Sequence, residues 1–229
     1  MHAFKHHSRN LDERSPLRTR GTFVSTPAWL YDLMVWGFLY HGKEQQFRQM
    51  IVDLARLQLG ESVLDVGCGT GTLALEASKH VGKTGRVSGI DPSAQLLAGA
   101  HRKAKRARLP IDFQRGQIER IPFPDQSFDV VLSTFVLHHV PDDLKRQGLT
   151  EIVRILKPEG RLLVVDFKRS SDRQSMSEHV GAGEIDLGDI PALMKNAGFF
   201  QTETGETPLS VRSLAAGHQN SGFVLAKKA

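Results

Sequence analysis

Three glycines at alternate positions constrain the fold of this chain more than any other stretch of it. Val63 to Val66 is a short, mostly apolar run of strand-favouring residues, and Gly67, Gly69 and Gly71 follow at every second position. An Ala/Leu-rich run with helical spacing comes next, so the order predicts a buried strand, a tight turn and a helix. Glycine suits a turn that a bulky group approaches closely, at backbone angles that other residues tolerate poorly.

An acid further along the chain indicates what approaches the turn. Asp91 closes a second expected strand and comes about 20 residues after Gly71, which is the spacing of an acid that accepts hydrogen bonds from ribose hydroxyls. The helix after the turn begins with free N–H groups that point toward the same place. Together these features predict a site for a nucleoside-bearing cofactor.

The glycine spacing separates two classes of cofactor. A dinucleotide fingerprint is G-x-G-x-x-G, whereas here Gly71 comes one residue early and Asp65 stands two residues before Gly67. A carboxylate beside the turn repels a pyrophosphate but suits a cationic amino-acid group. A glycine-rich turn without any ligand is the alternative, and it explains neither Asp65 nor Asp91.

The turn resembles the first motif of the class I S-adenosylmethionine-dependent methyltransferases. From about Tyr31 to Phe167 the chain resembles the branch that includes the ubiquinone and menaquinone biosynthesis C-methyltransferases. The further stretches that carry the resemblance are Tyr31-Asp32, Gly89 to Ser93, Ile121 to Asp125, Ser127 to Asp129, Val136 to Val140 and Leu156 to Gly160. The resemblance implies the cofactor S-adenosyl-L-methionine, with S-adenosyl-L-homocysteine as product. These motifs are weak indicators of the acceptor, because many chemistries share them.

The resemblance also implies which residues hold the methionine end of the cofactor. The residues that would lie against the methionine and ribose are Gly67, Gly69, Thr70 and Gly71. Ser133, after the fourth strand, would line the methionine side. Asp65 is counted with them because its carboxylate suits the amino group, directly or through water. Tyr31 could close over the cofactor.

At the other end, the resemblance implies that Asp91 holds the ribose hydroxyls and that Leu96 packs on the adenine face. Gln117 and Ile118 would edge the adenine ring. Gln117 departs from the family, which usually has an Asp there, but a glutamine carbonyl can accept the same hydrogen bond. The region after Phe167 is also shorter than in many quinone methyltransferases, and this leaves the particular quinone open.

No catalytic residue is assigned. Methyl transfer from a sulfonium is an in-line displacement, so an enzyme mainly aligns the reactants in a dry site. A phenol, enol or amine acceptor is helped by a base, and His138 or His139 lies within reach after the fourth strand. A structural turn is the alternative for these histidines. No metal site is expected, because neighbouring histidines usually point apart and the cofactor needs no metal.

Strands and helices alternate through the chain, which predicts an α/β fold: a Rossmann-like, doubly wound sheet with helices on both faces. The seven expected strands are 63–66, 86–91, 111–116, 128–134, 161–167, 199–206 and 221–226. Helices are expected over 44–57, from about 72 to 81, from 93, over 142–156 and over 186–196. The last two strands have no full helix between them, so the C-terminal strand is expected to be antiparallel in a mostly parallel sheet.

The chain of 229 residues is long enough for one large core. We expect a flexible leader over 1–21, an N-terminal helical cap over 22–58 and a cofactor-binding methyltransferase domain over 59–229. Both tryptophans and both tyrosines lie between Trp29 and Tyr40. This segment either closes over an apolar substrate pocket or packs on the sheet edge, and both interpretations stay open.

The composition of the chain limits its cellular location and the partners that are expected for it. The single cysteine, Cys68, excludes an internal disulfide and favours a reducing, cytoplasmic location. No stretch is long enough for a transmembrane segment. The formal charge is +5, and much of it lies between His101 and Arg108. We interpret this cluster as a solvated helix end rather than a nucleic-acid or anionic-membrane patch, so no nucleic-acid partner is expected. The oligomeric state is not predicted.

The expected function is S-adenosylmethionine-dependent methyl transfer to a small, largely apolar acceptor, by C- or O-methylation of a quinone-like or phenolic molecule. Three alternatives stay open. The chain could be an NAD-type oxidoreductase, a cofactor-binding protein without turnover, or an RNA or protein methyltransferase that uses its basic helix.

Overall fold

The computed structural model of the chain describes residues 26–35, 37, 42–168, 187–208, 211–213, 217–219 and 221–229. The leader expected over 1–21 lies outside the described residues.

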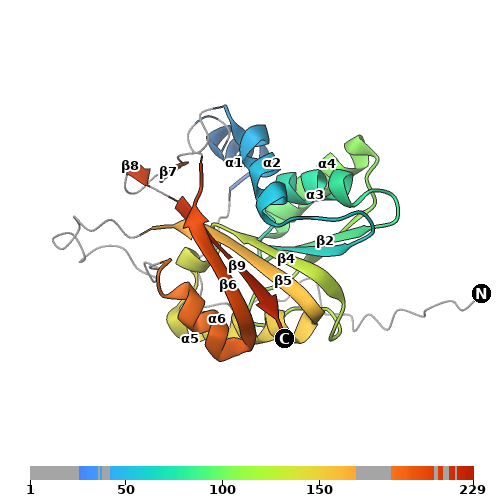
Figure 1. Cartoon of the computed structure of the whole chain (residues 1–229). Coiled ribbons are helices and arrows are strands. Elements are labelled where there is room, and N and C mark those ends of the chain that lie inside the picture. The colour runs from blue at the N-terminus through green and yellow to red at the C-terminus, as the bar shows by residue number, and fades with distance from the viewer. Residues whose placement is uncertain are drawn as a thin grey trace, which may run out of the picture.

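One seven-stranded sheet forms the centre of the molecule (Figure 1). Its strands are β1 (Ser62–Val66), β2 (Arg86–Asp91), β3 (Ile111–Arg115), β4 (Phe128–Thr134), β5 (Leu156–Phe167), β6 (Phe199–Glu206) and β9 (Ser221–Lys228). The order is β3-β2-β1-β4-β5-β9-β6. Pairing is parallel from β3 to β5, and β9 runs antiparallel to both β5 and β6. The predicted fold class is therefore confirmed, including the antiparallel C-terminal strand.

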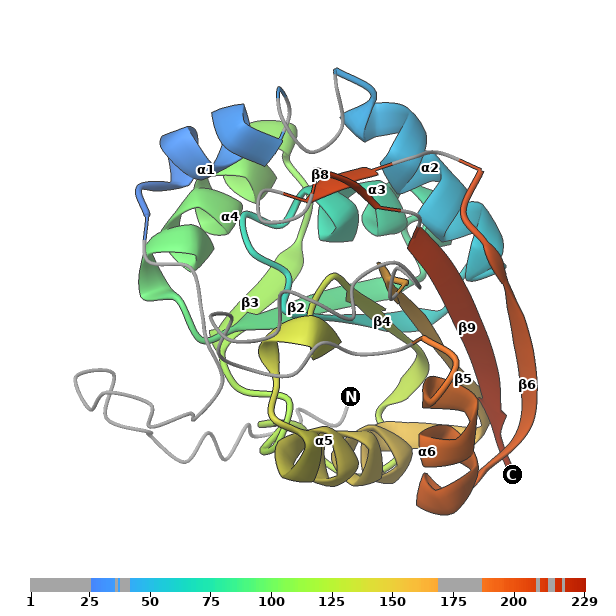
Figure 2. The same cartoon turned by 90° about the vertical axis from the view of Figure 1, so that its left-hand side faces the viewer.

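Five helices cover the two faces of the sheet (Figure 2). On one face lie α2 (Glu44–Leu54), α3 (Thr72–Val81) and α4 (Ala94–Ala107), and on the other lie α5 (Asp142–Ile155) and α6 (Ile190–Ala197). A shorter helix, α1 (Ala28–Met34), lies beside α4. A single 3₁₀ turn, η2 (Leu137–His139), follows β4, and a separate two-stranded pair is formed by β7 (Val211–Ser213) and β8 (Gly217–Gln219). None of these helices is long and apolar enough to cross a bilayer.

Alternating side chains of the strands build two cores. In β1, Val63 packs in the core under α2, α3 and α4, whereas Leu64 and Val66 pack in the core over α5 and α6. Residues of one strand alternate between the faces, so Asp65 shares the face of Val63. A carboxylate at such a position is out of place in an apolar core, and this marks the end of β1 as a functional position.

Local backbone chemistry explains most helix ends. Ser93 begins α4 as predicted, because its hydroxyl accepts a hydrogen bond from the Leu96 amide. Gly198 ends α6 with φ +113°. The helix expected over 44–57 stops at Leu54, and Arg56, two residues later, is left-handed with φ +54°.

The start of β5 differs from the prediction. The strand was expected from Arg161, but it begins at Leu156, which pairs with Phe128. The register then shifts, so that Val130 pairs with Arg161. The intervening residues form an excursion in which Glu159 is left-handed with φ +63°. A Lys-Pro-Glu-Gly stretch is typical of such a turn, which is why the sequence alone suggested a complete break.

Candidate functional site

The glycine turn lies at the carboxyl end of β1 and has the conformation that its composition predicts. Gly67, Gly69 and Gly71 have φ values of +71°, +54° and +75°. A Cβ atom on Gly67 would stand 2.4 Å from a methyl of Val136, and one on Gly71 would stand 2.6 Å from the ring of Phe113. Any side chain at these two positions would therefore meet both backbone strain and a collision.

Asp91 holds the turn from the next strand. Its Oδ2 accepts a hydrogen bond from the Gly69 amide at 2.9 Å, and its Oδ1 accepts one from the Ser93 amide at 2.8 Å. Burial raises the pKa of Asp91, and the two amides oppose that shift. Each carboxylate oxygen can accept a further bond, so the side chain can serve the turn and a ligand together.

Asp65 is the second acid of the site, and its surroundings satisfy its carboxylate only in part. It pairs in the sheet with Gly89, two residues before Asp91, so the two acids come from adjacent strands. The side chain of Asp65 is 1% exposed, and its Oδ2 has no hydrogen-bond partner. Burial raises the pKa of Asp65 to about 7; the nearby Arg48 opposes the shift, and Asp91 adds to it. A cationic group placed beside Asp65 would compensate a buried charge that is otherwise costly.

Two further predicted residues also carry buried polar atoms without partners. One is Ser133 Oγ, near the end of β4, where Ser133 pairs with Val66 of β1. The other is Gln117 Nε2, in the segment after β3. Native interiors rarely leave such atoms unpaired. With Asp65 they form three unsatisfied positions along the carboxyl edge of the parallel strands, where ligands bind in open α/β sheets.

Leu96 and Ile118, the two apolar residues predicted at the adenine, are both buried. Leu96 lies in the first turn of α4 and is 3% exposed. Ile118 packs in the core over α5, where a Cβ on Gly148 would stand 2.7 Å from it. The side chain of Ile118 therefore belongs to the core, and only its backbone is left for a ligand.

The helix α1 covers the glycine turn. Asp32 Oδ1 accepts hydrogen bonds from Thr70 Oγ1 at 2.6 Å and from Lys103 Nζ at 2.7 Å. Lys103 Nζ also donates to Thr70 Oγ1 at 2.8 Å. The ring of Tyr31 lies beside Gly69, 3.5 Å from where a Cβ would stand. Thr70 and Tyr31, two of the predicted residues, thus meet in the contact between α1 and the turn.

A small cavity of about 70 Å³ lies between α1, α2 and the turn. It is lined by Tyr31, Val35, Glu44, Arg48, Asp65, Gly67, Cys68, Thr70, Thr72, Leu73, Thr134 and Phe135. Ligand pockets usually exceed about 300 Å³. Tyr31, which lines the cavity, lies beside Gly69, so a nucleoside-sized ligand requires side chains around the turn to move apart.

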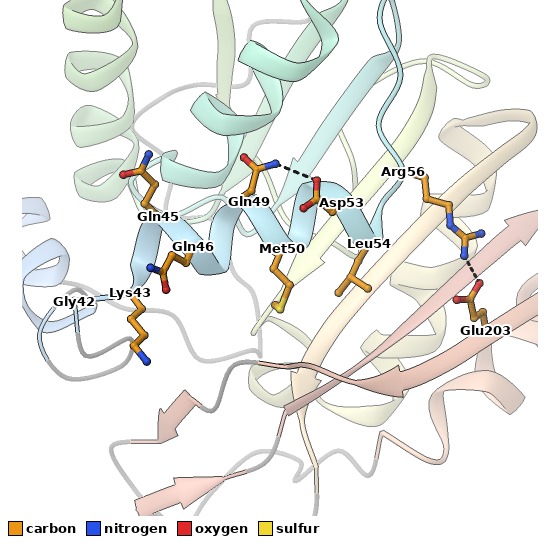
Figure 3. A pocket seen from close by; sticks show the side chains of 10 residues that line it. All are labelled: Gly42, Lys43, Gln45, Gln46, Gln49, Met50, Asp53, Leu54, Arg56 and Glu203. Atoms are coloured by element: carbon orange, nitrogen blue, oxygen red, sulfur yellow. Dashed lines mark hydrogen bonds and ion pairs between the residues drawn. The ribbon is translucent and has the colours of Figure 1, made fainter.

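The larger hollow of the molecule is elsewhere. A groove of about 890 Å³ runs along α2, and Figure 3 shows the side chains that line it, with Arg56 paired with Glu203 of β6 at one end. None of the predicted site residues lines this groove. Its walls are mostly exposed polar side chains, and its size alone does not make it the site of chemistry.

Beyond the turn, the structure brings together an imidazole and a buried carboxylate. His138 Nδ1 lies 2.8 Å from Asp166 Oδ1, and Asp166 is fully buried at the end of β5. Asp166 also accepts hydrogen bonds from the amides of Leu137, His138 and Phe167. Burial lowers the pKa of His139 to about 4, and the neighbouring His138 adds to the shift.

Two residues near the site, Asp166 and Arg48, were not predicted from the sequence. Asp166 ends an apolar strand just as Asp91 ends β2, so an acid at a strand's carboxyl end was the available signal. Arg48 lies within an ordinary amphipathic helix and carries no comparable signal. Cys68 is buried beside Gly89, and burial raises the pKa of its thiol, so this cysteine acts as a small core residue rather than as a reactive thiol.

The comparisons with known proteins agree with this geometry. Residues 63–160 match a family described as "Methyltransferase domain". The matched stretch contains the glycine turn, both acids and the parallel strands β1 to β4. This match confirms the resemblance to the class I S-adenosylmethionine-dependent methyltransferases that the sequence predicts.

Within that class, the chain is similar to quinone methyltransferases. It is 39% identical over 139 residues to the demethylmenaquinone methyltransferase of Listeria welshimeri, a match that covers 59% of this chain and 57% of that protein. It is 38% identical over 133 residues to the 2-phytyl-1,4-naphtoquinone methyltransferase of a Synechocystis strain, covering 57% and 55%. The matches thus span somewhat over half the length of these curated relatives.

Solved structures share the fold. A SAM-dependent methyltransferase from Aquifex aeolicus superposes with a TM-score of 0.63 at 22% identity, covering 90% of this chain and 100% of that one. The matches favour the methyltransferase interpretation over the oxidoreductase alternative.

Proposed function

We propose that this protein transfers a methyl group from S-adenosyl-L-methionine to a small, largely apolar acceptor of quinone-like or phenolic type, at carbon or oxygen. The observation that carries the proposal is the pair of buried acids around the glycine turn, of which Asp65 has an unsatisfied oxygen. The names of the relatives reported above, both quinone methyltransferases, support the acceptor class.

The residues present fit this cofactor. Asp91 has accepting capacity left for the ribose hydroxyls, and Asp65 provides a carboxylate for the ammonium group of the methionine. Gln117 has an amide that is still free at Nε2 and a carbonyl that can accept from adenine. Ser133 Oγ is free on the methionine side. When bound, the cofactor supplies an electrophilic methyl on a sulfonium.

The protein itself contributes by aligning the acceptor with the cofactor and by enclosing both. Once Tyr31 has moved to admit the cofactor, α1 would still cover the glycine turn and exclude water from the bound reactants. Alignment of a nucleophile with a bound methyl group is itself a large part of the rate enhancement.

A base is available for an acceptor that must lose a proton. The contact between His138 Nδ1 and Asp166 favours the tautomer whose Nδ1 carries the hydrogen, so Nε2 is left to accept a proton. His139 is the poorer candidate, because its pKa is lowered to about 4. We therefore assign the role of base to His138 and the role of orienting it to Asp166.

The proposal includes a cytoplasmic location and an acceptor that is a small molecule rather than RNA or protein. The test is a screen with S-adenosylmethionine labelled in its methyl group, against quinols, phenols, amines, thiols, lipids and RNA. We expect labelled quinols or phenols, and loss of cofactor binding by calorimetry in Asp91→Asn.

The matched control is Asp112→Asn, which makes the same change at an exposed position of β3. Its cofactor affinity should equal that of the wild type. Preferential binding of NADH, or label found only in RNA, would contradict the proposal. Normal cofactor binding with no labelled acceptor would support the alternative of a binding protein without turnover.

A further inference from the structure

The outer face of α1 is apolar and exposed. Trp29, Leu30 and Leu33 are 68%, 41% and 56% exposed. At about 100° per residue, positions i, i+1 and i+4 of a helix fall within one arc of about 100°, so the three side chains share one face. Of the other large exposed hydrophobic residues in the described parts of the chain, Leu59 lies in the loop before β1 and Phe200 lies in β6.

The opposite face of α1 is fixed to the domain. Ala28 packs so closely on α4 that a Cβ on Gly99 would stand 2.6 Å from its methyl. One turn later, Asp32 pairs with Lys103 of the same helix. Both contacts are four residues apart on each helix, so α1 lies along α4, as Figure 2 shows. The apolar residues are therefore held outward by a packed helix.

Cations lie beside this apolar face. Arg102 and Arg106 of α4 are exposed. They stand one residue before and three residues after Lys103, so their side chains project on the side of α4 that adjoins α1. His101 and Lys105 of α4 are also exposed, as is Arg108 just after the helix ends. We call Trp29, Leu30, Leu33, Arg102 and Arg106 the docking face.

We propose that the docking face binds the surface of a bilayer that contains anionic lipids, and this proposal replaces the interpretation of residues 101–108 as a solvated helix end alone. Aliphatic and indole side chains enter the boundary between headgroups and acyl chains, while neighbouring arginines pair with anionic headgroups. RNA would satisfy the arginines but would leave Leu30 and Leu33 in water. The combination of an apolar arc with adjacent cations therefore fits a lipid surface better than a nucleic acid.

The location of the docking face gives the contact a purpose. The same helix presents Trp29 to the outside and holds Tyr31 beside Gly69. Docking therefore brings the bilayer next to the cover of the glycine turn, and an apolar acceptor can pass to the site without crossing bulk water. This consequence rests on the proposed function, whereas the docking itself does not.

The test is cosedimentation of the full chain with vesicles of phosphatidylcholine alone and of phosphatidylcholine mixed with phosphatidylglycerol. We expect binding to the mixed vesicles, weakened by salt, and a blue shift of tryptophan emission that is reduced in Trp29→Phe. The double variants Leu30→Ser/Leu33→Ser and Arg102→Gln/Arg106→Gln should each lose about tenfold or more in vesicle affinity.

Two control variants change the same residue types elsewhere. Leu59→Ser removes an exposed leucine, and Lys79→Gln/Lys83→Gln removes two cations around the end of α3. Both should bind vesicles as the wild type does. Thermal unfolding checks that every variant is folded. Methylation of a water-soluble, short-chain acceptor should be unchanged in the docking variants, which separates failure of docking from failure of the proposed function.

Three outcomes would overturn the proposal. They are absence of wild-type binding to the mixed vesicles, an equal loss in the control variants, and a loss of RNA binding in Arg102→Gln/Arg106→Gln without any loss of vesicle binding.

Discussion

At the scale of single residues, Asp65 has the most informative environment. A carboxyl group whose pKa rises on folding destabilises the folded state once the unfolded chain can ionise it. Below its ordinary pKa of 3.8, both states hold the proton and nothing is lost. Between 3.8 and about 7 only the unfolded state releases it, so stability falls as the pH rises, and above about 7 the loss is complete.

We predict that Asp65→Asn stabilises the protein without cofactor. The gain over the wild type should grow by up to about 1.4 kcal/mol per pH unit through this window and level off above it. Urea unfolding at several pH values measures the gain. Asp112→Asn, at the exposed position, should show no such pH dependence. A constant difference across the window would contradict the assignment.

A second prediction concerns His138 and Asp166. His138→Gln should lower the methylation rate of a phenolic acceptor by about 100-fold or more and remove the acidic limb of the pH–rate profile, because the base is gone. Asp166→Asn should also lower the rate, since the imidazole loses its orienting carboxylate. Cofactor affinity should stay near that of the wild type in both.

His139→Gln is the matched control for this pair, and it should keep the acidic limb. A profile in His138→Gln with the wild-type shape would assign these histidines to the structural turn that the sequence left as the alternative.

At the scale of elements, α1 shows how a short helix is held in place. Seven residues are too few for a stable isolated helix, so its contacts with α4 and the turn have to support it. The link from Asp32 to Thr70 and Lys103 is the polar part of that support.

We predict a coupling free energy of about 0.5–1 kcal/mol between Asp32 and Lys103 in a double-mutant cycle to Ala, measured by urea unfolding. Amides of α1 should also exchange faster in Asp32→Ala, since the helix detaches locally. The control is the more exposed pair Arg56–Glu203, which should couple less. Equal coupling in the two cycles would mean that the link does not hold α1.

Most elements could be predicted because their signals are local. The apolar runs and glycines gave β1, β2 and β4 to within a residue, and Ser93 marked the start of α4. The early start of β5 could not be predicted, since the pairing of Leu156 with Phe128 is a contact between distant segments. The position of α1 over the turn depends in the same way on Gly99 and Lys103.

At the scale of the whole molecule, the site joins segments that lie far apart in the sequence. We predict that S-adenosylmethionine at 100 times its dissociation constant stabilises the fold by about 2.7 kcal/mol. For a chain of this size that corresponds to a rise of about 5–10 °C in the unfolding temperature. NADH at the same concentration should give no rise. A larger rise with NADH than with S-adenosylmethionine would reverse the assignment of the cofactor.

The candidate site was predictable where a residue has a local signal in the sequence. Asp65 stands next to the glycine turn, and Asp91 stands at the end of a strand. It was not predictable where packing decides. Arg48 reaches Asp65 only because α2 packs on α3, and Ile118 turns its side chain into the core over α5. Such placements follow from the assembled layers rather than from any motif.

Asp91 accepts hydrogen bonds from two backbone amides, and this also changes what an aspartate at the same position indicates in other chains. A descendant that had abandoned catalysis would still need this acid to keep its loop in shape. An aspartate at this position in a newly sequenced gene therefore indicates descent from the same family, but it does not indicate activity. If His138 is the base that we propose, an active enzyme is better recognised by a histidine and an acid that match His138 and Asp166.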